Sequence, residues 1–295
     1  MDEDNQPTPT LRVLRHPAML LVLAVLTAFC SIIVTMQIGR LVGASDGPVG
    51  ALVASIVVAV LFVAIYAAFR RWVEGQPVRE FALPGAGVEL GAGLLTGLIL
   101  FSLIVGVIAA FGGYRVIGTN PWSVMVPSLG IAILSGFTEE IMFRGWFFRL
   151  VERWLGSWAA LVLSAGLFGA LHLSNPNATL FAGIAIMFEA GIMLAAIYMI
   201  TRRLWAVIGV HVAWNLAQGG IYGIPVSGEV MEGVLRPRIS GSDLLTGGGF
   251  GAEASLPAVV VATAFGVAML YVAYRRGRFM APIWVRRRQR AAEQA

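Results

Sequence analysis

Residues 48–69 read PVGALVASIVVAVLFVAIYAAF, an unbroken apolar stretch without an acidic or basic side chain. Its length matches the ~20 residues that an α-helix needs to cross the hydrocarbon core of a bilayer. The whole chain is similarly apolar: 58% of its 295 residues are hydrophobic and only 13% are charged. A soluble domain carries about 25% charged residues. The stretch therefore predicts a membrane-spanning helix within an all-α protein.

Similar apolar segments recur along the chain. They predict a polytopic transmembrane helical bundle of about eight spans, at residues 17–39, 48–69, 90–111, 123–148, 157–173, 178–200, 204–222 and 256–274. The first span is too long for a signal peptide and no cleavage site follows it, so we expect a retained helix. The predicted organisation is a disordered cytoplasmic N-terminus (1–16), N-terminal transmembrane helices (17–119), a core of further transmembrane helices (120–222), an external loop (223–255), and a last transmembrane helix with a basic cytoplasmic tail (256–295).

The basic side chains predict the orientation. All 21 of them are arginines, and with the N-terminus in the cytoplasm only Arg40, Arg115, Arg236 and Arg238 fall outside. The positive-inside rule therefore predicts that both termini are cytoplasmic. The arginines flank apolar spans and do not line one polar face, which argues against nucleic-acid binding. The single cysteine, Cys30, excludes an internal disulfide and a cysteine-based metal site.

The segment 223–255 is the longest polar connection. It contains several acidic residues and a run of three glycines, Gly247 to Gly249. This composition predicts an external, flexible and mildly acidic loop. The sequence assigns it no role.

A few polar side chains lie inside the apolar spans. An unpaired ionisable group in lipid costs roughly 2.5 kcal/mol or more, so these groups are functional candidates by default. They are Glu139, Glu140, Arg144, His172, Glu189 and His211, together with the amide of Asn215. Glu189 has no partner at a helical spacing, and we expect it to be structural or to line a cavity.

Helical spacing indicates which of these groups act together. Glu140 and Arg144 are four residues apart, so they share a helix face and can pair. Glu139 is rotated about 100° from its neighbour and stays free for another task. His211 and Asn215 also project from one face.

Depth along the helices supports a single site. At 1.5 Å per residue, the polar groups lie roughly 12 to 22 Å from the inner ends of their helices. His172 also has an aromatic residue, Phe168, one turn before it. One site built from three helices is therefore expected.

Two kinds of chemistry fit this set. A carboxylate in a low-dielectric pocket becomes a general base near neutral pH, a histidine relays protons, and an amide stabilises an oxyanion. Together they suit the attack of water on an amide carbonyl. Two histidines and a carboxylate also resemble a zinc site with an open position, although the chain has no H-E-x-x-H motif. Spacing alone leaves both open.

Three motifs in sequence order carry a family resemblance. Residues 139–144 (EEIMFR), 168–172 (FGALH) and 211–215 (HVAWN) fit E-E-x-x-x-R, F-x-x-x-H and H-x-x-x-N. They resemble the CPBP family of CAAX proteases and bacteriocin-processing enzymes (the Abi family), whose prototype is the type II CAAX prenyl endopeptidase. The resemblance covers roughly residues 120–220.

The resemblance implies roles for the motif residues. Glu139 would activate water, His172 would assist as acid or base, and His211 and Asn215 would stabilise the oxyanion. Glu140 and Arg144 would support the site. The family has been described both as metalloproteases and as using a glutamate-activated water; we favour the second and leave a divalent metal such as zinc open.

Three functions compete. The favoured one is an intramembrane endopeptidase acting on a membrane-associated, lipidated or C-terminal CAAX-like peptide. The second is a non-catalytic scaffold or bacteriocin-immunity protein of the same fold, against which the three intact motifs argue. The third is a proton-coupled transporter, which would predict internal repeats that the sequence lacks. The composition suggests a bacterial cell membrane, and neither the substrate nor its prenylation can be read from the sequence.

Overall fold

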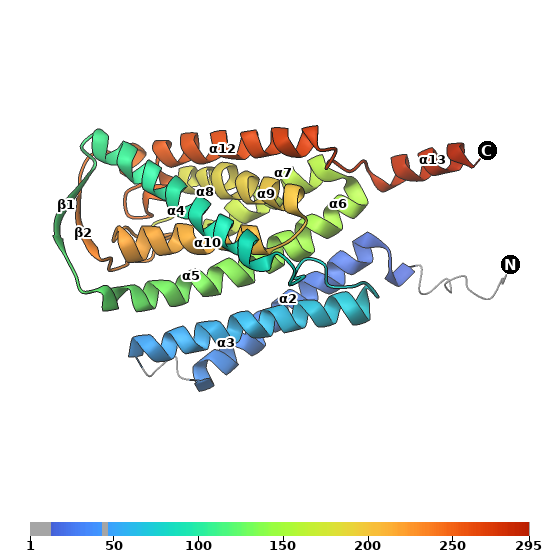
Figure 1. Cartoon of the computed structure of the whole chain (residues 1–295), viewed down its shortest axis with the longest axis horizontal. Coiled ribbons are helices and arrows are strands. Elements are labelled where there is room, and N and C mark those ends of the chain that lie inside the picture. Colours follow the sequence, from blue (N-terminus) through green and yellow to red (C-terminus); the bar gives the residue numbers. More distant parts are fainter. Residues whose placement is uncertain (1–12, 43–46, 295) are drawn as a thin grey trace.

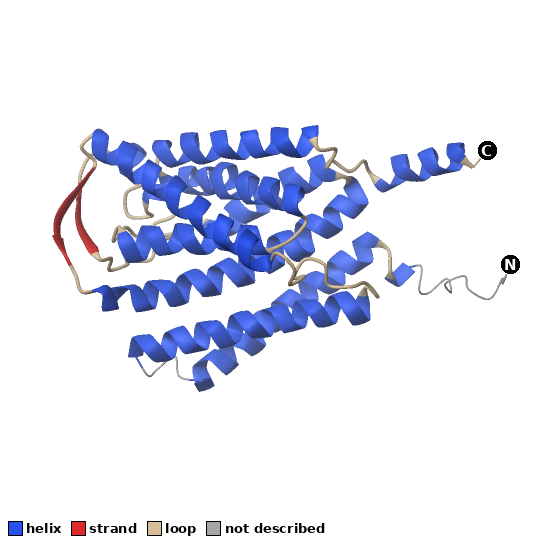
Figure 2. Ribbon diagram, in the orientation of Figure 1, coloured by secondary structure: helices blue, strands red, loops and turns tan. Residues whose placement is uncertain are grey.

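The computed structural model describes residues 13–42 and 47–294. The described chain is a bundle of helices lying roughly along one common axis (Figures 1 and 2). The N-terminal half contains α2 (Pro17–Val42), α3 (Gly47–Ala68), α4 (Ala86–Ala110), β1 (Tyr114–Thr119), α5 (Met125–Glu140), α6 (Arg149–Leu155) and α7 (Ser157–His172). The C-terminal half contains α8 (Leu180–Ile186), α9 (Ile192–Thr201), α10 (Trp205–Asn215), β2 (Leu235–Ile239), α11 (Asp243–Thr246), α12 (Leu256–Arg275) and α13 (Ile283–Glu293).

Four π-helical turns extend or join these helices. They cover Phe69–Val73 after α3, Ile141–Phe148 between α5 and α6, Met187–Gly191 between α8 and α9, and Leu216–Ile221 after α10. The turns at Ile141–Phe148 and Met187–Gly191 continue into a further helix, whereas the other two form the last turn of theirs. The chain from Trp122 to Leu155 is therefore one long helical unit, as expected for the fourth span.

The all-α polytopic bundle is confirmed, and each of the eight predicted spans contains a helix. Six helical units in the described residues are long and apolar enough to cross a membrane by length and composition. The fifth predicted span is shorter, with 16 residues in α7, and the seventh corresponds to α10 and its π-helical continuation. The structure thus supports a membrane protein with at least six candidate spanning units, while the count of eight stays a prediction.

The connection at 223–255 is not the flexible loop that its composition predicts. Its strand β2 pairs antiparallel with β1, from Tyr114 opposite Ile239 to Thr119 opposite Leu235. The strand pair closes one end of the bundle, at the left of Figure 1. Further along, residues 250–255 are all buried, because the chain folds back between the helices before α12 begins. Backbone packing has fixed a segment that glycine content alone suggested was mobile.

Close approach between α4 and α10 holds the centre of the bundle together. A side chain added at Gly93 of α4 would place its Cβ 2.2 Å from the carbonyl oxygen of Ala206 on α10. Small residues allow such helix contacts in membranes, where van der Waals packing drives association. The Gly and Ala richness is therefore explained by helix packing, and it fixes α10, which carries the third motif, in the core.

The two ends of the described chain lie at the same end of the bundle. The start of α2 and the helix α13 both lie at the right of Figure 1, opposite the strand pair. Predicted disorder at residues 1–12 lies outside the described residues. Residues 13–16 make a turn, in which the His16 backbone N–H donates to the Val13 carbonyl over 3.1 Å, so this part of the predicted disordered terminus is ordered.

Candidate functional site

The first motif lies where α5 continues into its π-helical turn. Glu140 and Arg144 are fully buried, and Arg144 Nη1 donates to Glu140 Oε1 over 3.0 Å. Arg144 Nη2 also donates to the backbone carbonyls of Ala190 and Gly191, over 2.9 Å and 3.2 Å. The expected pair between residues 140 and 144 is therefore present. It ties α5 to the helical unit formed by α8 and α9.

His211 joins the first motif to the third. Its Nδ1 lies 2.7 Å from Glu140 Oε1, a carboxylate oxygen that also accepts from Arg144. Nδ1 therefore donates, and Nε2 faces Glu139, whose Oε2 is 3.9 Å away. The side chain of Glu139 keeps 26% of its area exposed while that of Glu140 keeps none. The rotation between the two neighbouring glutamates thus separates a buried anchoring group from an accessible one.

His172 is oriented by its own helix. Its Nδ1 lies 2.7 Å from the Phe168 carbonyl oxygen. Because a carbonyl can only accept, Nδ1 carries the proton and Nε2 remains available. The Phe168 ring centroid is 4.7 Å from the ring of His172 and 6.4 Å from that of His211, and Arg144 lies over its face at 4.8 Å. One aromatic ring therefore packs against groups from all three motifs.

Asn215 is held by a residue that the motif search missed. Its Nδ2 donates to Ser135 Oγ over 2.9 Å, and Ser135 Oγ donates in turn to the Ile131 carbonyl. Ser135 precedes Glu139 by four residues, so it lies on the same face of α5. That four-residue spacing is the sequence feature that could have identified Ser135, but a serine four residues before a glutamate is common in helices. The amide of Asn215 still has a second N–H that this bond does not use.

A small cavity lies between the second and third motifs, and Glu139 of the first motif is not among the residues that line it. Its polar wall consists of His172, Glu189, His211, Asn215, Ser227 and Glu253. Glu189 lines the cavity, which is one of the two roles that we expected for it from the sequence. Ser227 and Glu253 come from the connection expected to be an external loop, and no sequence motif marked them.

The same side chains include the two histidines and the carboxylates that could ligate a metal ion. Within residues 13–42 and 47–294, no three His, Cys, Asp or Glu side chains converge as a group that could hold one ion. His211 and His172 each commit Nδ1 to an acceptor of the chain itself, which leaves one ring nitrogen of each, Nε2, as an available ligand. A catalytic zinc needs three protein ligands and an open position. The donor set does not fit such a site, so no metal-dependent step follows from it.

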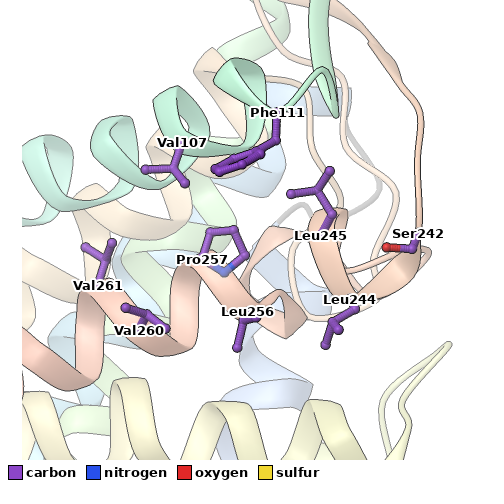
Figure 3. Close-up of a pocket in the computed structure, with 9 residues that line it drawn as sticks. All are labelled: Val107, Phe111, Ser242, Leu244, Leu245, Leu256, Pro257, Val260 and Val261. Carbon is purple, nitrogen blue, oxygen red and sulfur yellow. The ribbon is translucent and has the colours of Figure 1, made fainter.

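A second cavity of the molecule lacks this chemistry. Figure 3 shows an open groove of about 820 Å³ between α4, α11 and α12. Every residue on its wall is apolar except Ser242. A groove without an acid, a base or a strong polar group cannot activate water, whatever its size. The smaller cavity between the motifs is therefore the candidate active site.

The π-helical turns coincide with the polar groups of the site. Glu140 is the last residue before the second of the four turns, Glu189 lies within the third, and Asn215 directly precedes the fourth. Such turns occur frequently at functional sites, because the extra residue redirects the side chains around it. Three independent helices show this feature at the same place in the bundle.

Comparison with known proteins bears on the same segment. Residues 121–217 match the family model described as type II CAAX prenyl endopeptidase Rce1-like, a stretch that contains all three motifs. No curated protein and no solved structure matches the chain. The segment from 121 to 217, which builds most of the candidate site, belongs to the CAAX-protease family of membrane proteins.

Proposed function

We propose that the chain is an intramembrane endopeptidase that hydrolyses peptide bonds with a glutamate-activated water. The observation that carries this proposal is the approach of Glu139 to His211, 3.9 Å apart, beside a polar cavity that His211, His172 and Asn215 line inside a bundle of apolar helices. Neutral, water-excluding surroundings strengthen the electrostatic effect of each of these groups. Family membership supports the same reaction class.

Glu139 is the general base of the proposed reaction. Its carboxylate is the more accessible of the two neighbouring glutamates, whereas Glu140 is occupied by Arg144 and His211. Glu139 takes a proton from water, and the hydroxide attacks the scissile carbonyl carbon. A carboxylate placed in this way contributes roughly 10²- to 10⁴-fold to the rate.

The remaining polar groups handle the charge that develops. The carbonyl oxygen becomes an oxyanion, which accepts hydrogen bonds from the free N–H of Asn215 and from His211 when Nε2 is protonated. The tetrahedral intermediate collapses with cleavage of the C–N bond. The proton that Glu139 took from water passes by way of His172 Nε2 to the leaving amine, so that water has added OH to one fragment and H to the other.

The proposed substrate is a peptide close to or within the membrane. A prenylated CAAX-like C-terminus fits the family name, and a short bacteriocin precursor fits the wider group equally well. We place the protein in a bacterial cell membrane with both termini in the cytoplasm, on the strength of its arginine distribution and of the common end at which the described termini lie.

Released peptide ends in cells test the proposal. Cells that express the wild-type chain should accumulate new N-termini from membrane-associated proteins, measured by mass spectrometry of N-terminally labelled peptides. Cells expressing Glu139→Gln at the same level should lack them. Identical sets of termini in the two strains would contradict an endopeptidase activity and would favour the scaffold or immunity role.

A further inference from the structure

Two carboxyl groups on the cavity wall have no part in the proposed reaction. Glu189 lies in the π-helical turn between α8 and α9, and Glu253 lies in a short 3-10 helix just before α12. Both line the same cavity as His172, His211 and Asn215. Their position next to the reacting groups makes their charge relevant to whatever enters.

Glu189 is buried without any partner. It is 1% exposed, and neither of its carboxyl oxygens receives a hydrogen bond from the described residues. An unsatisfied buried carboxylate is strongly unfavourable, and native structures rarely leave one without a reason. The carboxyl oxygens of Glu189 are therefore available to form hydrogen bonds with a group that enters the cavity.

Glu253 is held against the cavity by its backbone. The residue is 2% exposed, and its Oε1 accepts from the backbone N–H of Ser227. Gly251, two residues earlier, has φ +120° and lies so close to Pro225 that a Cβ would be 2.1 Å from its carbonyl oxygen. Two residues later, Ser255 Oγ caps α12 by accepting from the Ala258 N–H over 3.2 Å. The position of Glu253 is thus fixed on both sides.

Neither carboxyl group is paired with an arginine of the described chain, and the charged group that acts on Glu253 is His172, which opposes the rise that burial causes in the pKa of Glu253. Among the ion pairs of the described residues, none involves Glu189 or Glu253, and the nearby guanidinium of Arg144 is taken by Glu140. Burial raises the pKa of Glu253, a shift that the hydrogen bond from Ser227 only partly opposes. Within the described residues, the pair therefore lacks a fixed counter-charge that an entering cation could supply.

We propose that Glu189 and Glu253 form a specificity pocket for a cationic nitrogen group of the substrate next to the scissile bond. The group is the guanidinium or ammonium of an Arg or Lys side chain, or a free α-amino group. This inference rests on the proposed function, since it names the substrate class of the same site. A cationic nitrogen would satisfy the unpaired carboxyl oxygens of Glu189, whereas an isoprenoid chain would press its hydrocarbon against two acids.

A matched set of peptides tests the pocket. The full-length protein is reconstituted in phosphatidylcholine vesicles with internally quenched peptides, in which one Arg is moved through an otherwise uncharged sequence. A second series carries citrulline, the neutral isostere of Arg, and every peptide is made with a free and an acetylated N-terminus. The readout is the ratio of kcat/KM between the Arg and citrulline peptides, and between the free and acetylated peptides.

We expect one of these ratios to reach about 10- to 100-fold, the range of a charge-assisted hydrogen bond in a buried site. A preference that follows Arg at one position identifies a side-chain pocket, and one that follows the free N-terminus identifies an α-amino pocket. In Glu189→Gln and in Glu253→Gln the same ratio should fall to about one. Glu229→Gln, which alters an exposed acid of the same connection, should keep it.

Peptide binding separates this inference from the proposed function. Glu139→Gln is titrated into fluorescently labelled Arg and citrulline peptides, and anisotropy reports binding without hydrolysis. Hydrolysis by the wild type without any charge preference would overturn the pocket and leave the endopeptidase intact. A charge preference in binding with no hydrolysis by the wild type would support the pocket and refute the endopeptidase. Absence of both, or a preference that survives both substitutions, would overturn the pocket.

Discussion

Two buried acidic regions of the chain are built in opposite ways. At the arginine-rich end of the bundle, Glu74 is surrounded by Arg70, Arg149 and Arg153, which reach its Oε2 over 2.6, 2.8 and 2.9 Å. We call this group, with Glu80 beside it, the Glu74 network. Burial by itself would raise the pKa of Glu74, but the hydrogen bond and charge of Arg149, then Arg70 and Arg153, lower it.

The cavity acids lack any such compensation. Glu189 and Glu253 are as deeply buried as Glu74, yet no arginine pairs with either within the described part of the chain. The chain neutralises charge by itself where an acid joins helices. In the cavity it leaves neutralisation to a proton or a ligand. The difference separates structural from functional acids more clearly than burial does.

We expect the largest loss of stability from a substitution in the Glu74 network. Glu74→Gln leaves three guanidinium groups facing each other without a full counter-charge. Removing one partner of a buried ion pair costs about 3–5 kcal/mol. We expect that loss in the free energy of unfolding of the purified protein in detergent, measured by denaturant titration followed by Trp fluorescence. A loss under 1 kcal/mol would show that the network is solvated and would break the comparison.

Acid should act on the two regions with opposite sign. The lowered pKa of Glu74 means that its contribution to stability is present above the unfolded value, about 4.3, and is lost as the pH falls through the folded pKa. The raised pKa of Glu253 means that its protonation on acidification favours the folded state. The control is each Gln variant, which should lack its own part of the pH profile.

Unfolding midpoints between pH 3 and pH 7 measure these two contributions. Glu74→Gln should flatten the loss of stability at the acid end, and Glu253→Gln should raise stability near neutral pH relative to the wild type. Parallel profiles for the wild type and both variants would mean that neither carboxyl changes its proton affinity on folding.

We expect the smallest change in the stability of the protein from a substitution in the cavity. Glu189→Gln removes an acid that has no partner, so it should leave the free energy of unfolding unchanged or raise it by about 1 kcal/mol. The same denaturant titration, run beside Glu74→Gln, provides the measurement. A destabilisation as large as that of Glu74→Gln would reveal a structural role for Glu189 and would remove the basis of the proposed pocket.

Local patterns in the sequence were sufficient for much of this arrangement. Continuous apolar segments predicted the helices, since a helix in lipid must satisfy its own backbone. The four-residue spacing predicted the contact of Glu140 with Arg144. These features depend on residues within one helix, where geometry follows directly from sequence separation.

Contacts made by the connection between residues 223 and 255 escaped prediction. The pairing of β1 with β2 and the return of Glu253 to the cavity connect parts of the chain far apart in sequence. The glycine run predicted flexibility, whereas glycines such as Gly251 permit close backbone packing. Glu189 was recognised as unusual, but its environment depends on three other helical segments that no spacing rule places.

Cleavage by the purified protein tests the central claim most directly. The wild type and Glu139→Gln are reconstituted side by side in vesicles with the same peptide set, and products are identified by mass spectrometry. Our account predicts cleavage by the wild type and a loss of about 10²- to 10⁴-fold in kcat for Glu139→Gln. The unfolding midpoints of the two proteins should remain similar, because Glu139 is partly exposed and the Glu140 anchor is intact. Undiminished cleavage by Glu139→Gln would contradict the assignment of Glu139 as the base.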